Sequence, residues 1–205
     1  MYPKIRKPFD GSYLISMRYG EAREWYVKIA GYPHNGVDFA MPDGVAIVAC
    51  DDGVIEFADN VPDSNGLGVN IRHTLGLSQY WHLSRLTAKY GQGVKKGEVI
   101  GYSGHSGWVT GPHLHFGVKV NAIGNDVMRG WSDPMLCISE EVVEPIDQVS
   151  EIKTYTVKQG DSLWKIAEQF LGNGIKWPYI YRLNSDVIKD PNLITIGMVL
   201  KIPSV

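Results

Sequence analysis

The segment Gly111-Pro-His113-Leu-His115-Phe-Gly-Val-Lys-Val120 contains the strand from which both the fold and the chemistry can be predicted. Residues 114–120 form a short run of the β type, preceded by a glycine-rich stretch. Side chains two positions apart in a strand lie on the same face, roughly 6–7 Å apart at the backbone. We therefore expect His113 and His115 to point toward the same small volume.

Short runs of the same β type recur through the residues that come before this segment. They lie at 45–49, 54–57, 69–73 and 99–102, and glycines separate them. Regular turn signals between short β-branched runs indicate an antiparallel sheet of the sandwich or barrel-like kind. A short helix also fits residues 21–30. The sequence therefore predicts a mainly β domain over residues 1–137.

The composition changes after this domain. Residues 138–152 hold five acidic residues, no basic residue and Pro145. That composition is typical of a solvated linker, although an edge strand of the first domain also fits. Residues 153–205 hold seven basic and four acidic residues, so the charge changes sign again. We expect an acidic linker over 138–152 and a separate module over 153–205.

The module is expected to have the order β-α-α-β. Residues 154–158 alternate like a strand. Between residues 163 and 171, apolar side chains recur at i, i+3, i+4, i+7 and i+8, which is one face of a helix. A second helix is expected from residue 177, and a last strand over 198–202. Most of the aromatic side chains of the module are expected to fill its small core.

A cluster of metal-binding residue types is present in the first domain. Imidazole nitrogen and carboxylate oxygen are both zinc ligands. In His34-Asn-Gly-Val-Asp38, four residues of extended strand would span roughly 13 Å, too far for one ion. Gly36 permits a bend or bulge that would close this gap. With His82 also available, we expect one metal site, but spacing alone does not say which residues are ligands.

Three motifs resemble those of the lysostaphin-type zinc endopeptidases of bacterial cell walls. They are His34-Asn-Gly-Val-Asp38-Phe-Ala-Met-Pro, Tyr80-Trp-His82-Leu-Ser and Gly111-Pro-His113-Leu-His115-Phe. The resemblance covers roughly residues 9–137. It implies cleavage of a peptide bond and one Zn²⁺ per chain.

The resemblance also implies roles that spacing leaves open. His34, Asp38 and His115 would be the zinc ligands, and His82 and His113 the active-site histidines that bind no metal. Three protein ligands leave a fourth position for water, as in catalytic zinc sites. One of the two remaining histidines would take a proton while the other positions the tetrahedral oxyanion. We favour His113 as the base, and the choice between the two stays open.

The module resembles a LysM domain, a family that binds N-acetylglucosamine chains in peptidoglycan or chitin. The resemblance rests on Tyr155-Thr-Val-Lys-Gln-Gly160-Asp-Ser-Leu-Trp164 and Leu200-Lys-Ile-Pro203. It implies a glycan site in two loops, which hold Gly160, Asp161, Ser162, Leu163, Asn192, Leu193 and Ile194. In the first domain, His73 stands where the endopeptidases carry a histidine near the groove, so a substrate contact is expected there.

Composition excludes several other classes of function. The 205-residue chain has a formal net charge of −2, which does not indicate general nucleic-acid binding. It has no run of about 18 apolar residues, so no membrane-spanning helix is expected. Cys50 and Cys137 form no CxxC metal motif, and one disulfide or two buried free thiols both remain open.

Together these resemblances imply a monomeric peptidoglycan hydrolase. It would cleave peptide stems or cross-bridges of the bacterial cell wall while the LysM domain holds the glycan. The alternatives are a catalytically inactive wall-binding protein and a structural component of a phage tail. The first 20 residues contain no secretory signal peptide. This favours a phage or prophage lysin, released by a holin or carried on the virion.

Overall fold

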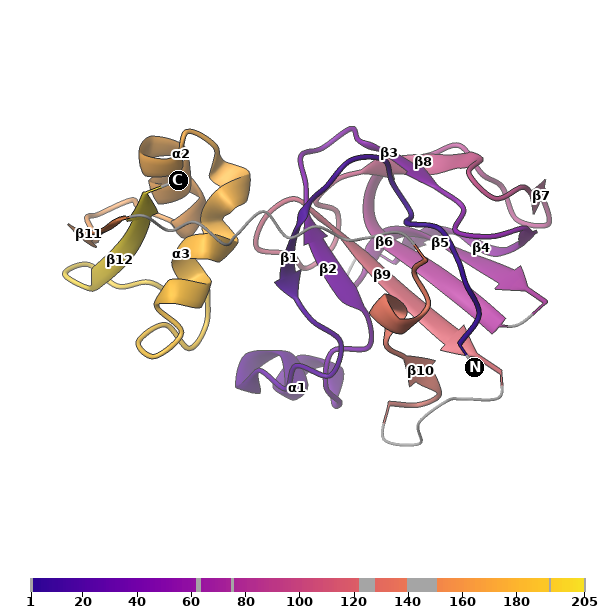
Figure 1. The fold of residues 1–205 in the computed structure, drawn as a ribbon, viewed down its shortest axis with the longest axis horizontal. Helices are drawn as coiled ribbons and strands as arrows, with labels where there is room; N and C mark the ends of the chain where they lie inside the picture. The colour runs from indigo at the N-terminus through magenta and orange to yellow at the C-terminus, as the bar shows by residue number, and fades with distance from the viewer. Residues whose placement is uncertain are drawn as a thin grey trace.

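The computed structural model describes residues 2–61, 64–74, 76–121, 128–139, 151–191 and 193–204. Most of the predicted linker 138–152 lies outside the described residues. Figure 1 shows a larger, mainly β part and a smaller part with two helices. Within the described residues, no helix is both long and apolar enough to cross a membrane.

Ten described strands of the larger part form one antiparallel sheet. They are β1 (Leu14–Met17), β2 (Val37–Ala40), β3 (Ala46–Val48), β4 (Gly53–Val61), β5 (Gly66–His73), β6 (Gly76–Leu86), β7 (Gly93–Val94), β8 (Val99–Ser103), β9 (His113–Val120) and β10 (Trp131–Ser132). The order is β1-β2-β9-β6-β5-β4-β7, with β10 on β9 and with β8 pairing both β3 and β6 (Figure 1). The predicted mainly β, antiparallel fold class is confirmed.

Two short helical segments complete the larger part. Helix α1 (Glu24–Ala30) lies between β1 and β2, and the 3-10 turn η1 (Pro134–Leu136) follows β10. Helix α1 begins three residues later than the sequence predicts, because Arg23 has an extended backbone with ψ 131°. It ends at Gly31, whose φ of 78° is the left-handed conformation that glycine adopts readily.

The core of the larger part explains the two cysteines. Aromatic and aliphatic side chains such as Phe39 and Phe116 are fully buried there. Cys50 and Cys137 are buried among them as free thiols. Burial raises the pKa of Cys50 to about 11, so this thiol stays protonated at neutral pH. Both cysteines therefore act as small apolar side chains.

Strand β6 changes its pairing partner on one edge at His82, while β5 stays paired with its other edge. Up to Trp81 it pairs with β9, and from Leu83 it pairs with β8. His82 itself has a φ of 66°, a left-handed conformation that is uncommon for residues other than glycine. An irregularity of this kind bends the strand and redirects a side chain. Here it sends the His82 ring away from the regular pleat of β6.

The smaller part contains β11 (Glu151–Thr156), α2 (Leu163–Leu171), the 3-10 turn η2 (Gly174–Lys176), α3 (Trp177–Leu183) and β12 (Val199–Ser204). Strands β11 and β12 form an antiparallel pair. The predicted β-α-α-β order is confirmed. Ser162 caps α2 by accepting a hydrogen bond from the Lys165 N–H at 3.2 Å.

The described ends of the predicted linker belong to regular structure. Ile138 is 7% exposed in the core of the larger part, and the Ser139 hydroxyl donates to the Ile5 carbonyl at 2.9 Å. Strand β11 already begins at Glu151. Residues at both ends of the predicted linker therefore belong to the two folded domains.

Candidate metal centre and the histidines around it

The pairing of β2 with β9 brings the first two candidate ligands together. Asp38 is directly opposite His115, and Ala40 is directly opposite His113. Side chains of directly opposed residues lie on the same face of the sheet. The His115 Nδ1 atom is 2.9 Å from Asp38 Oδ1, and His113 Nε2 is 3.8 Å from Asp38 Oδ2.

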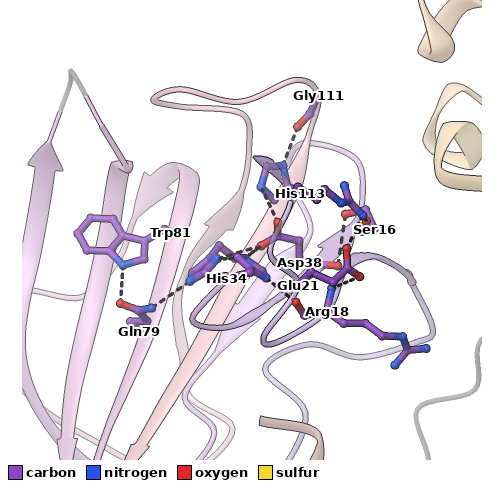
Figure 2. Close-up of polar contacts among 11 residues, drawn as sticks. Ser16, Arg18, Glu21, His34, Asp38, Gln79, Trp81, Gly111 and His113 are labelled. Carbon is purple, nitrogen blue, oxygen red and sulfur yellow. Dashed lines mark hydrogen bonds and ion pairs between the residues drawn. The ribbon is translucent and has the colours of Figure 1, made fainter. Parts of the chain in front are cut away.

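His34 reaches this pair from the turn that precedes β2. Its backbone N–H donates to the Glu21 carbonyl at 2.9 Å, and its carbonyl accepts from the Gly20 N–H at 2.8 Å. The His34 ring then points at Asp38 (Figure 2), with Nε2 3.0 Å from Asp38 Oδ1. The same Nε2 atom is 2.9 Å from His115 Nδ1. His34 Nε2, Asp38 Oδ1 and His115 Nδ1 therefore lie within 3.0 Å of one another.

The three side chains fit a zinc ion. Two imidazole nitrogens and one carboxylate oxygen are a ligand set of catalytic zinc sites, which keep a further position open. The far nitrogen of each ring is also held: His34 Nδ1 donates to the Arg18 carbonyl at 3.0 Å, and His115 Nε2 lies 2.9 Å from the Gln79 side-chain nitrogen. A contact of the kind that His34 makes, from a ring N–H to a carbonyl, orients a metal-binding imidazole.

The charge states of these groups also suit a cation. Burial alone would raise the pKa of Asp38, but the imidazoles of His34 and His113 and hydrogen bonds from His115 and His34 hold it well below its usual value. Burial lowers the pKa of His115. The site therefore offers an ionised carboxylate and a neutral ring at neutral pH, which are the forms that bind metal.

His82 and His113 lie beside this group, with ring centres 4.6 Å apart. Both are oriented by the segment between β8 and β9. His82 Nδ1 donates to the Ser106 carbonyl at 3.0 Å, and His113 Nδ1 donates to the Gly111 carbonyl at 2.9 Å. Because Nδ1 donates in both rings, Nε2 is the nitrogen of each ring that can accept a hydrogen bond.

All five side chains line one cavity of about 470 Å³. Aromatic residues form much of its wall, namely Trp25, Tyr26, Tyr32, Trp81 and Trp108. Trp177 and Pro191 of the smaller part also line it. The cavity is large enough for a small ligand or a short segment of a chain.

The remaining candidate residues lie elsewhere. His73 does not line the cavity: its Nδ1 donates to the Asp52 carbonyl at 2.8 Å, and its Nε2 lies 2.7 Å from Ser78 Oγ. In the smaller part, Leu163 is buried in the core, whereas Leu193 is 68% exposed. The loop that holds Gly160, Asp161 and Ser162 is at least partly exposed, as is Ile194, while Asn192 lies outside the described residues.

The Gln79 side chain at the centre of the site is not predicted by the sequence motifs. The Trp81 indole N–H donates to Gln79 Oε1 at 3.1 Å, which sets the orientation of the Gln79 amide against His115 (Figure 2). A glutamine in a strand carries no sequence signal for such a role. The Arg18, Ser106 and Gly111 carbonyls were missed for a similar reason, because every residue has one.

Gly36 lets the chain cross close to β9. A Cβ atom at this position would lie 2.5 Å from the Phe116 carbonyl oxygen and 2.8 Å from His115 Nε2. We expect Gly36→Ala to push β2 and β9 apart, to destabilise the domain by about 1–3 kcal/mol and to lower the zinc content. Thermal unfolding and elemental analysis measure both effects.

Gly93→Ala is the matched control, because a Cβ there would meet nothing within 4 Å. It should keep both the melting temperature and the zinc content of the unaltered chain. If Gly36→Ala behaved in the same way, the close crossing would not be what places His34 beside His115.

The comparisons with known proteins agree with this geometry. Residues 32–127 match peptidase family M23, and residues 155–203 match the LysM domain. The chain is 34% identical over 163 residues to the peptidoglycan DD-endopeptidase ShyA of Vibrio cholerae, covering 77% of this chain and 37% of that protein. It is 38% identical over 109 residues to lysostaphin of Staphylococcus simulans, covering 52% of this chain and 22% of that protein.

Solved structures give the same result. The catalytic domain of lysostaphin from Staphylococcus simulans aligns with a TM-score of 0.53 and 33% identity, over 60% of this chain and 90% of that domain. A mutant catalytic domain of the prophage-encoded M23 protein EnpA from Enterococcus faecalis aligns with a TM-score of 0.51 and 29% identity, over 65% of this chain and 95% of that domain.

The curated relatives are longer proteins. The chain spans between 21% and 37% of the length of the first five of them. Its similarity to the lysostaphin catalytic domain, by contrast, extends over nearly all of that domain. The chain therefore belongs to peptidase family M23, and its C-terminal part is a LysM domain.

Proposed function

We propose that this chain is a zinc-dependent endopeptidase that cleaves the peptide part of bacterial peptidoglycan. The observation that carries the proposal is the meeting of His34, Asp38 and His115 in a cavity that also holds His82 and His113. The relatives support the substrate, because ShyA is a peptidoglycan DD-endopeptidase and ALE-1 of Staphylococcus capitis is a glycyl-glycine endopeptidase. These two names also leave both kinds of peptide bond open for this chain.

In this proposal His34, Asp38 and His115 hold one Zn²⁺. When bound, zinc supplies Lewis acidity toward a carbonyl oxygen and lowers the pKa of a water molecule toward about 7. The chain supplies a fixed orientation for the His34 ligand, because the Arg18 carbonyl accepts a hydrogen bond from His34 Nδ1. It also buries the three ligand side chains, which are at most 12% exposed.

We assign proton transfer to His113. Its Nδ1–H donates a hydrogen bond to the Gly111 carbonyl, so Nε2 is the atom that can accept a proton from the attacking water. Asp38 Oδ2 lies 3.8 Å from that nitrogen and would stabilise the imidazolium that forms. The same ring can then return the proton to the amine that leaves when the peptide C–N bond breaks.

His82 is assigned a positioning role on the other side of the reacting group. Burial, together with the nearby imidazoles of His113 and His115, lowers its pKa well below the usual value. The ring is therefore neutral, and its Nε2 lone pair accepts a hydrogen bond from the reacting groups. Because the Ser106 carbonyl holds Nδ1, the ring stays aimed at the space beside His113.

The LysM domain would bind the glycan. We propose that its site includes the loops 160–163 and 192–194, where the exposed Leu193 offers apolar contact to an N-acetyl sugar. We also propose the division into a peptidase domain, 1–137, an acidic linker, 138–152, and the LysM domain, 153–205, in a monomeric enzyme. Its substrate places its action on the extracellular or periplasmic side.

A phage or prophage lysin is the setting that we propose for this enzyme. The similarity to the catalytic domain of EnpA supports it, because that protein is prophage-encoded. The alternatives without catalysis are less well supported, because all five candidate side chains are present and line one cavity.

Clearing of purified sacculi tests the proposal. The zinc-loaded chain should lower their turbidity, a zinc chelator should stop the clearing, and added Zn²⁺ should restore it. Mass spectrometry of the released fragments would then identify the bond that is cut. Binding to sacculi without any clearing by the zinc-loaded chain would leave only the wall-binding alternative.

A further inference from the structure

The strands β1 and β2 are buried on both faces. Ile15 and Phe39 point into the core of the peptidase domain. Leu14 and Ala40 point to the opposite face, where they are 5% and 0% exposed. A sheet with one covered face exposes the residues of its other face to water. Something therefore covers this outer face.

The cover is the LysM domain. Leu14 and Ala40 belong to the same buried apolar cluster as Trp177, Ile180 and Tyr181 of α3. Figure 1 shows the two domains side by side, with α3 nearest to β1 in agreement with their contacts. The LysM domain is thus packed on the peptidase domain and is held by more than the linker.

A partly buried cation reinforces this contact. The Arg23 guanidinium lies 4.7 Å from the centre of the Tyr181 ring, and it also donates to the Ser16 carbonyl at 2.9 Å and pairs with Glu21 at 2.7 Å. The Arg23 side chain is only 13% exposed. Cation–π contacts are stronger where water is excluded.

The covered face is also the face of the catalytic side chains. Ala40 follows Asp38 by two residues and is directly opposite His113 in the register of β2 and β9. Trp177 and Pro191 line the same cavity as His113. The packing of the LysM domain therefore ends at the cavity and closes one side of it.

The LysM domain also lies close to the segment that orients His113. A Cβ atom on Gly111 would lie 3.6 Å from the Trp164 ring and 3.7 Å from Trp177 Nε1, which is ordinary contact distance. The carbonyl of Gly111 is the group that holds His113 Nδ1. Gly111 therefore lies between the Trp177 indole and His113, the proposed base.

We propose that the docked LysM domain is part of the peptidase groove and that Trp177 and Pro191 form a binding wall for the peptide of the substrate. This inference rests on the proposed function. A Trp ring and a Pro ring offer apolar surface, and the indole N–H offers a hydrogen bond, which together suit a peptide segment with small side chains. Pro191 directly precedes the loop proposed to bind glycan, so one unit of peptidoglycan can contact both sites.

Leu14→Glu tests the proposal, because a carboxylate at this position would lose its water whenever the domains dock. The probe is a cross-linked stem peptide without any sugar, on which a glycan anchor alone has no effect. We expect kcat/KM for this peptide to fall about tenfold, chiefly through a higher KM, with one zinc per chain retained. Small-angle X-ray scattering of the full chain should show a larger radius of gyration.

Val54→Glu is the matched control, because Val54 is a strand residue that is 47% exposed, outside both the cavity and the covered face. It should leave the radius of gyration and kcat/KM unchanged. Tyr181→Leu is the second test variant, since it removes the ring beneath Arg23 but keeps an apolar side chain. It should raise KM in the same direction as Leu14→Glu.

Two outcomes would overturn the inference. An undocked variant with an unchanged kcat/KM for the sugar-free peptide would show that the LysM domain is only an anchor. A higher kcat/KM would show that the domain blocks the cavity. In both cases the unaltered chain still hydrolyses the peptide in a zinc-dependent way, so the proposed function stands. If the unaltered chain cleaved neither peptide nor sacculi, the proposed function itself would fail.

Discussion

Replacing His113 by alanine is expected to lower kcat by about 10²- to 10⁴-fold while the chain keeps one zinc ion. The ring lies next to the ligand group, yet its Nδ1 is held by the Gly111 carbonyl and its Nε2 is 3.8 Å from Asp38 Oδ2. Its removal takes away the proposed proton acceptor without taking away a ligand. Hydrolysis of a stem peptide and elemental analysis of the same preparation provide both readouts.

His105→Ala is the control for this variant. The His105 side chain is 64% exposed and pairs with Asp43 at 2.7 Å, outside the cavity. Its loss should change neither rate nor zinc content. Loss of zinc from the His113→Ala variant would show that His113 is a ligand. The roles assigned to His113 and His115 would then be reversed.

Asp38→Ala is expected to abolish hydrolysis by a different route, through loss of the metal. Asp38 supplies the only carboxylate of the ligand group, and its Oδ1 is within 3.0 Å of a nitrogen on both His34 and His115. Loss of an outer contact to a metal ligand already costs about 10- to 100-fold in affinity, so loss of the ligand itself should cost more. Zinc content after dialysis should fall far below one per chain.

The same variant should still bind sacculi, because the loops proposed to hold glycan lie in the LysM domain. Asp43→Ala is the control, since that carboxylate is 42% exposed and pairs only with His105 among the ion pairs of the described residues. If Asp38→Ala retained a full complement of zinc and lost activity all the same, the carboxylate would serve catalysis without binding metal.

The fold, and the gathering of the candidate side chains in one place, could be predicted from sequence because their signals are local. The His-x-His spacing requires only the period of a strand to place two rings on one face. The glycine between His34 and Asp38 marks a place where the chain can bend. The motifs add the family, and with it the proposed distinction between ligands and other histidines.

The contacts between distant parts of the chain could not be predicted in this way. Nothing in the spacing says that Asp38 pairs with His115 or that β6 changes its neighbour at His82, because strand register depends on both partners. The motif order predicts His73 near the groove. It lies instead in a hydrogen-bonded group with Asp52 and Ser78.

The docking of the LysM domain had a weak signal. Val37-Asp-Phe-Ala40 carries apolar residues on both faces of a short strand, and Leu14 adds an apolar side chain to the neighbouring strand. Apolar residues on both faces indicate a strand that is covered twice. The acidic composition of the linker indicates instead a module on a solvated tether, because composition does not report what the linked domains touch.

The change of partner within β6 limits how this enzyme can be redesigned. The register of a strand shifts with each inserted or deleted residue, so such a change between Gly76 and Trp81 would move His82 away from the point where β6 changes from β9 to β8. Substitutions in place preserve that register. A library meant to alter which bond is cut should therefore vary residue identity along β6 and reserve changes in length for the surface loops around the cavity.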